Sequence, residues 1–235
     1  MERVSREERQ LIRRWILQSS IFILVYSPAL LWLAGDFLWG AGWLYITILI
    51  AFLALHPVLL IPINPALLAE RARGTQTADT KQWDRVLTMI GPGLMPFLSQ
   101  TLSAIDHRLG WSGLSSGLHL IGTLMAILGY GLFLWAMVVK AYFAEGVRIQ
   151  SDRGHTVSQK GPYRIIRHPG YSGSILAVIG TPLILDTVWG LIPAIVAVVL
   201  IILRTVLEDR TLQAELDGYG EYKRDVRYKL FPGLF

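Results

Sequence analysis

Four long stretches of the chain contain no Asp, Glu, Lys or Arg, and this feature limits the fold more than any other. They cover residues 15–34, 41–63, 86–105 and 117–139. About 20 apolar residues in a helix cross the roughly 30 Å hydrocarbon core of a bilayer. Only 17% of the residues are charged, against about 25% in soluble domains. We therefore predict an all-α, polytopic membrane protein.

A fifth apolar region, residues 171–203, is interrupted near Asp186 and admits two interpretations, one long tilted helix or a hairpin of two short helices. Basic residues concentrate in the cytoplasmic segments of membrane proteins. If the region crosses twice, Arg108 is the only one of the 22 Lys and Arg residues on the outer side. If it crosses once, the basic C-terminus also lies outside. The charges favour the hairpin, with Asp186 and Trp189 in its outer turn, and about six transmembrane helices.

Six spans place both termini in the cytoplasm, together with the polar segment 141–170 and the tail 204–235, so that these two segments can touch. We treat residues 1–140 as an N-terminal four-span region. Residues 141–235 then form a C-terminal region with a cytoplasmic cofactor pocket. The N-terminus mixes acids with bases before a long apolar run, so we expect a retained span and not a cleaved signal peptide. The expected location is a bacterial inner membrane.

Composition also bears on the classes of partner and site. The net charge of +5 suits basic loops beside anionic lipid. Because the basic residues are spread over several loops, we expect no nucleic-acid partner. The chain has no cysteine, which excludes thiolate metal ligands and a cysteine nucleophile. Neither His56 nor His119 has a second ligand at metal-binding spacing, so we predict no metal site and expect local hydrogen bonds for both.

Two polar segments carry the candidate chemistry. The first, residues 154–173, reads GHTVSQKGPYRIIRHPGYSG, and its glycines and prolines forbid a continuous helix. Such backbone either lines a polar cavity or forms an interfacial loop that Arg167 and Tyr171 anchor. In the second segment, Arg204 and Glu208 are four residues apart and share one helix face. They form either a surface ion pair or a site that grips the two charges of a zwitterionic ligand.

The motif RHPGYSG, residues 167–173, resembles the RHPxYxG signature of the integral-membrane methyltransferases related to isoprenylcysteine carboxyl methyltransferase and phospholipid methyltransferase. The resemblance continues through GHTVSQKGPYR before the motif and through RTVLEDRTL and GEYKRDVRYKLFPG after it. It covers the last third of the chain densely, while NPALLAERARG and KQWDRVL resemble bacterial members more weakly. Asp209 departs from the family pattern, which has a second glutamate at that position.

The resemblance implies transfer of a methyl group from S-adenosylmethionine to a lipid-like or isoprenoid acceptor, with a carboxylate as the expected acceptor group. Arg204 matches the arginine that faces the acceptor, and it is the predicted catalytic residue. Glu208 suits the ammonium group of the cofactor, and tyrosine faces suit its sulfonium. No obligate protein partner is expected. The predicted cofactor-binding residues are His155, Thr156, Val157, Ser158, Tyr163, His168, Pro169, Gly170, Tyr171 and Glu208.

Several alternatives stay open at this point. Sterol-type reductases have a similar RHPxY-containing region that binds NADPH, although Glu208 suits an ammonium better than a phosphate. Phospholipid N-methylation and thiol S-methylation share the cofactor and differ only in the acceptor. A scaffold or small transporter should have paired ionisable residues near the bilayer midplane, and four of the predicted spans lack acids, Lys and Arg.

Overall fold

The computed structural model describes residues 5–73, 80–139, 143, 146–147 and 155–235. In this part of the chain every regular element is a helix, apart from one parallel bridge between Ile166 and Tyr228. The all-α prediction is therefore confirmed for the described residues. In chain order the elements are α1 (Arg6–Ala34), α2 (Gly40–Ile63), α3 (Pro65–Arg73), α4 (Gln82–Thr88), η1 (Met89–Leu94), α5 (Met95–Leu109), α6 (Ser116–Val139), η3 (Gly161–Arg164), α7 (Pro169–Ile184), α8 (Leu191–Glu215) and α9 (Tyr219–Asp225).

Four described helices, α1, α2, α6 and α8, are long and apolar enough to cross a membrane. The predicted third span is helical over residues 82–109, but the turns Met89–Leu94 around Pro92 are π-helical, because proline cannot donate its backbone hydrogen bond. Helix α7 has 16 residues, fewer than the roughly 20 of a full span. The chain is thus a multi-pass membrane protein, and the count of six spans stays a prediction.

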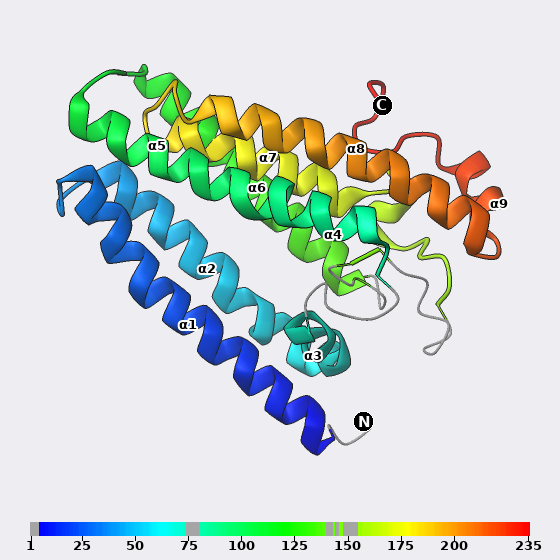
Figure 1. Cartoon of the computed structure of the whole chain (residues 1–235). Coiled ribbons are helices and arrows are strands. Elements are labelled where there is room, and N and C mark those ends of the chain that lie inside the picture. The colour runs from blue at the N-terminus through cyan, green and yellow to red at the C-terminus, as the bar shows by residue number, and fades with distance from the viewer. Residues whose placement is uncertain (1–4, 74–79, 140–142, 144–145, 148–154) are drawn as a thin grey trace.

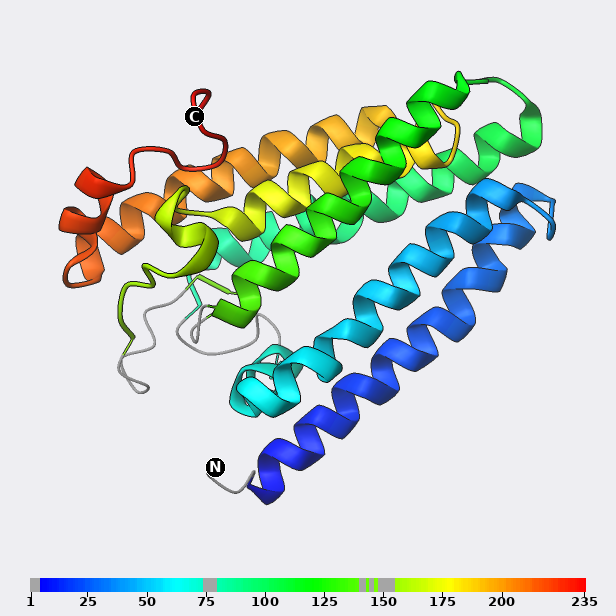
Figure 2. The same cartoon turned by 180° about the vertical axis from the view of Figure 1, so that it is seen from behind.

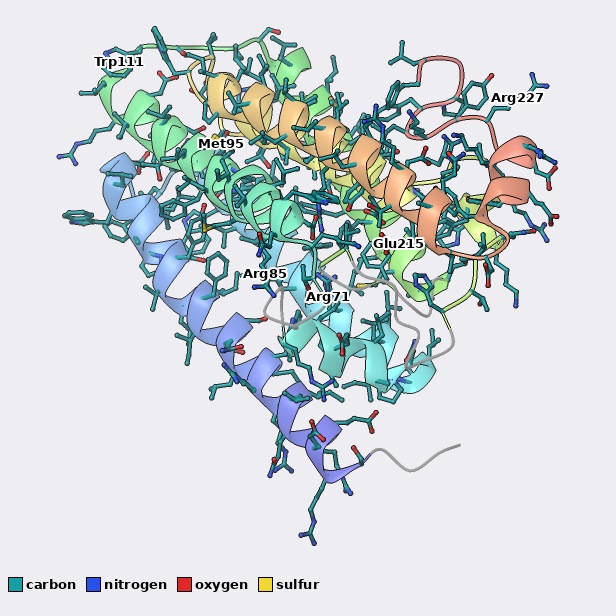
Figure 3. The ribbon with its side chains drawn as sticks, turned by 45° about the vertical axis from the view of Figure 1, so that its right-hand side comes forward. Arg71, Arg85, Met95, Trp111, Glu215 and Arg227 are labelled. Atoms are coloured by element: carbon teal, nitrogen blue, oxygen red, sulfur yellow. The ribbon has the colours of Figure 1, made fainter. Side chains whose placement is uncertain are left out.

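The helices run back and forth between two ends of the molecule. At one end lie the three connections α1–α2, α5–α6 and α7–α8, while α3 and α9 lie at the other (Figures 1 and 2). Trp111 marks the first end, and Arg71 and Glu215 lie toward the second (Figure 3). The boundary predicted at residues 140 and 141 falls outside the described residues.

Glycines let α6 and α7 pack backbone against backbone. A Cβ atom added at Gly129 would lie 2.5 Å from the carbonyl oxygen of Gly173, and one added at Gly122 would lie 2.8 Å from that of Gly180. Small residues at such positions are typical of membrane helix pairs, because they allow close van der Waals contact. The contact fixes α7, which begins in the RHPGYSG motif, against α6.

Helices α7 and α8 form the predicted hairpin, and its turn contains Asp186 and Trp189 as expected. Asp186 has a left-handed backbone conformation, with φ of 60°, which aspartate tolerates better than most residues. Its carboxylate accepts a hydrogen bond from the backbone N–H of Leu114 in the α5–α6 connection. The Asp186 carboxylate also lies 3.2 Å from Nε2 of His119. These contacts tie the turn to its neighbours.

Candidate active site

The polar segment 161–170 and the C-terminal tail meet as the sequence predicts. The backbone N–H groups of Arg167 and His168 donate to the carbonyl groups of Tyr228 and Lys229, at 3.0 and 2.9 Å. The Ser172 hydroxyl donates to the carbonyl of Leu230 at 2.6 Å. The tail therefore covers the motif at the start of α7, where Pro169 occupies the first helical position that proline favours.

A cavity of about 350 Å³ opens beside these segments, between the start of α7, α8, the end of α6, α3 and η1. Apolar side chains such as Phe133, Phe143 and Ile201 form part of its wall. Seven of the predicted site residues line it, namely His155, Tyr163, His168, Gly170, Tyr171, Arg204 and Glu208. Segments that lie far apart in the sequence thus share one cavity, whose wall combines charged and apolar side chains.

Tyr171 connects the two predicted charged residues. Its hydroxyl donates a hydrogen bond to Oε2 of Glu208, and its ring lies 5.2 Å from the guanidinium carbon of Arg204. The ring of His168 stacks beside Tyr171 at 5.7 Å between centroids. Tyr163 lies on the same cavity, and its burial, reinforced by the nearby Glu208 carboxylate, raises the pKa of Tyr163 well above its ordinary value. Tyr163 is therefore a neutral phenol across the physiological pH range.

Arg204 is held by a carboxylate that sequence reasoning missed. Its Nε and Nη2 groups donate to Oδ1 and Oδ2 of Asp84 at 2.6 and 3.2 Å. Asp84 belongs to α4 and is fully buried. The segment KQWDRVL already resembled bacterial family members, and the aspartate within it was the available signal. The role of Asp84 could be inferred only from the tertiary structure, in which α4 packs on α8.

Asp209, the residue that departs from the family pattern, has partners of its own. Arg167 donates to both of its carboxylate oxygens, at 2.8 and 3.3 Å, and Tyr219 donates from its hydroxyl at 2.8 Å. Nε2 of His168 lies 3.4 Å from the same carboxylate. Arg167 also donates to the carbonyl groups of residues 226 and 227. This buried network joins the motif to α8 and the tail, and Arg167, which also lines the cavity, is a buried residue and not an interfacial anchor.

Four predicted cofactor-binding residues lie off the main cavity. Thr156, Val157 and Ser158 line a small adjacent cavity of about 20 Å³, which shares His155 and Tyr163 with the larger one. Pro169 is buried at the start of α7. Contact between these residues and a cofactor stays a prediction.

A second cavity, of about 200 Å³, lies further along the helices. Its wall is mostly apolar, with Phe52, Tyr130 and Val178 among its members. It shares Arg71, Phe133 and Ile201 with the first cavity, among other residues. The guanidinium carbon of Arg71 lies 5.7 Å from the ring centroid of Phe133 and 5.9 Å from that of Phe143. Arg71 therefore lies where the two cavities adjoin.

Both histidines of the apolar stretches have local partners, as expected. Nδ1 of His56 lies 2.8 Å from the carbonyl oxygen of Phe52, one helical turn earlier. Nδ1 of His119 lies 3.1 Å from the carbonyl oxygen of Ile184, and its Nε2 faces Asp186. These contacts give both side chains the local partners that the sequence predicts.

Comparison with known proteins points to one group of enzymes. Residues 118–217 match the family model described as phospholipid methyltransferase. Two curated proteins named "Probable protein-S-isoprenylcysteine O-methyltransferase", from Oryza sativa subsp. indica and subsp. japonica, are each 35% identical to the chain over 66 residues. The match covers 28% of this chain and 35% of each relative, so the chain spans about a third of the length of these relatives.

Proposed function

We propose that the protein is a membrane methyltransferase that uses S-adenosylmethionine, because residues 118–217 match the family model described as phospholipid methyltransferase. The observation that carries the proposal is that Tyr163, Tyr171, Arg204 and Glu208 line one cavity. These residues fit the cofactor, because a carboxylate suits its ammonium and aromatic faces suit its sulfonium. The volume of about 350 Å³ also lies within the usual range of small-molecule sites.

Three of the cavity residues then have a chemical task, namely Glu208, Tyr171 and Arg204. When bound, S-adenosylmethionine supplies an electrophilic methyl group and takes the C–S bonding pair onto sulfur. Glu208, oriented by the Tyr171 hydroxyl, would hold the cofactor amino group. Arg204 would orient the acceptor through its N–H groups, in a site that aligns the reactants and excludes water. A carboxylate oxygen forms the new C–O bond, the product is a neutral ester, and no proton has to be removed.

The second cavity supports a lipid-like or isoprenoid acceptor. Its mostly apolar wall suits a hydrocarbon tail, and Arg71 and Arg204 suit a carboxylate at the end of that tail. The relatives' names specify O-methylation of S-isoprenylcysteine, which is the same class of acceptor. We further propose that both termini and the cavity face the cytoplasm, since all but one of the basic residues flank the spans on that side in the six-span topology.

A second candidate is N-methylation of a phospholipid amine, which the description of the matching family favours. That reaction needs a neutral amine and therefore a group that accepts a proton. The carboxylates near the site are engaged, Glu208 with the Tyr171 hydroxyl and Asp84 with Arg204. A carboxylate acceptor has no such requirement, so we place it first.

The test uses the purified full chain in lipid nanodiscs with methyl-labelled S-adenosylmethionine and fractionated membrane lipids. We expect label to enter a lipid product that releases methanol in mild alkali, because carboxyl methyl esters hydrolyse there and N-methyl groups do not. Alkali-stable label would support N-methylation or S-methylation instead. Saturable binding of NADPH, with none of S-adenosylmethionine or its demethylated product, would refute the methyltransferase and favour a reductase.

Two substitutions separate the proposed roles. Glu208→Ala should abolish cofactor binding, whereas Arg204→Ala should retain binding and lose turnover. Arg210→Ala is the matched control, because this side chain is also on α8 but is exposed. Isothermal titration with the demethylated cofactor measures the first effect and methyl transfer the second. Unchanged cofactor affinity in Glu208→Ala would contradict the assignment.

A further inference from the structure

Asp84 is the carboxylate with the most specific contact to the proposed catalytic residue. It lies 120 positions before Arg204 in the chain, is 0% exposed, and receives hydrogen bonds from Nε and Nη2 of that arginine. This two-pronged geometry constrains both the position and the plane of a guanidinium. Asp84 therefore determines how Arg204 is oriented at the cavity wall.

The same carboxylate also anchors part of the cavity wall. Oδ2 of Asp84 accepts a hydrogen bond of 2.7 Å from the backbone N–H of Val147, which lines the cavity. The carbonyl of Val147 accepts from the N–H of Lys81 at 3.2 Å. Next to it, a Cβ added at Gly146 would lie 2.7 Å from the Thr80 side chain. The start of α4 thus packs closely against residues 146 and 147.

Helix geometry shows what Arg204 would do without Asp84. Glu208 lies one turn further along α8, at the four-residue spacing at which an arginine and a glutamate pair. Glu208 already attracts the Arg204 guanidinium electrostatically, and with Asp84 neutral the Nε and Nη2 groups of Arg204 would be released to pair with Glu208. Arg204 would then compete with the cofactor ammonium for Glu208, since both are cations that seek the same carboxylate.

We propose that Asp84 is a positioning residue that holds Arg204 at the cavity wall and limits its pairing with Glu208, the proposed partner of the cofactor ammonium. This inference rests on the function proposed above. It predicts an unusual pattern of coupling, in which loss of the Asp84 charge weakens cofactor binding only while Arg204 is present. A residue that merely braced the wall at Val147 would not show that dependence.

The test measures the affinity of the full chain, in detergent, for the demethylated cofactor in four proteins. These are the wild type, Asp84→Asn, Arg204→Gln and the double variant. We expect Asp84→Asn to weaken binding about tenfold, Arg204→Gln to leave it unchanged, and the double variant to regain wild-type affinity within about threefold. Turnover should be lost in all three variants. Lys81→Met is the control, because it breaks the ion pair of 2.7 Å with Glu215 beside Asp84 without touching Arg204, and it should bind normally.

Each other result is decisive. Equal weakening in Asp84→Asn and the double variant, wild-type affinity in Asp84→Asn at any turnover, or weakened binding in Arg204→Gln would overturn the inference. If Asp84→Asn is the only variant that fails to fold, thermal unfolding of the double variant replaces the binding assay as the test. Removing both charges of a buried pair costs far less stability than leaving one charge without its partner. A folded double variant then supports the coupling between Asp84 and Arg204. An unfolded double variant would show that Asp84 only stabilises the cavity wall at Val147, and it would overturn the inference. A wild type that binds no cofactor would refute the proposed function and not the coupling.

Discussion

Replacement of Gly173 by alanine tests the contact between α6 and α7 that holds the RHPGYSG motif in place. A Cβ at Gly173 would lie 2.4 Å from the carbonyl oxygen of Gly129 and 2.8 Å from the backbone nitrogen of Phe133. Real Cβ contacts essentially never fall below 3.0 Å, so the helices must separate locally by at least 0.6 Å, from 2.4 to 3.0 Å. Both neighbours are backbone atoms, and no side-chain rotation relieves the clash.

The magnitude follows from two opposing effects. Overpacking costs about 1–3 kcal/mol, while alanine in a helix gains about 0.5–1 kcal/mol over glycine. The net loss of about 1–2 kcal/mol lowers the Tm by roughly 3–6 °C for a chain of this size. Because Tyr171, two positions before Gly173, and Ser174, which follows it, both line the cavity, cofactor affinity should fall as well.

The assay is thermal unfolding in detergent, followed by tryptophan fluorescence. Gly131→Ala is the matched control, because Gly131 lies on α6 with no heavy atom within 4 Å of its added Cβ, so its Tm should equal or exceed that of the wild type. A Gly173→Ala protein that melts as high as the Gly131→Ala protein would refute the close-packing argument.

Three further substitutions test the buried network and the cavity. Asp209→Asn should lower the free energy of unfolding by about 3 kcal/mol, because it leaves the buried guanidinium of Arg167 without its carboxylate partner. An unchanged Tm in detergent would contradict this prediction. Tyr171→Phe should weaken binding of the demethylated cofactor roughly tenfold, since Glu208 loses the hydroxyl that orients it. Isothermal titration measures the change, and an affinity equal to that of the wild type would show that Glu208 does not need this hydrogen bond. Arg71→Gln should raise the KM for a carboxylate acceptor roughly tenfold at unchanged cofactor affinity, because the Arg71 side chain lies where the two cavities adjoin. Steady-state kinetics measures the KM, and a value equal to that of the wild type would exclude Arg71 from acceptor recognition.

Much of the fold was predictable because membrane insertion imposes simple requirements on composition. Charge-free stretches identified four long helical segments, and the distribution of basic residues favoured the hairpin at Asp186. The third segment and α7 were harder to classify, because Pro92 introduces π-helical turns and α7 is short. Hydropathy does not register either effect.

The site was predictable where its residues are close in sequence. Arg204 and Glu208 share a helix face through their spacing alone, and the residues of GPYRIIRHPGY lie together because they are neighbours in the chain. Asp209 shows the limit of such reasoning. It adjoins Glu208 in sequence but points to Arg167 and Tyr219, because successive helical residues face different directions.

The sequence by itself determined that the chain is helical, enters the membrane repeatedly, and carries a polar segment and an arginine–glutamate pair near one another. Only the tertiary structure decided which partner holds each charge. Asp84 reaches Arg204 across 120 positions, and Arg71 reaches the cavities from α3, because helix packing brings together segments that have no local relation. Spacing along a chain predicts neighbours within one helix, whereas contacts between helices depend on how their side chains fit, and that fit is a property of the folded molecule.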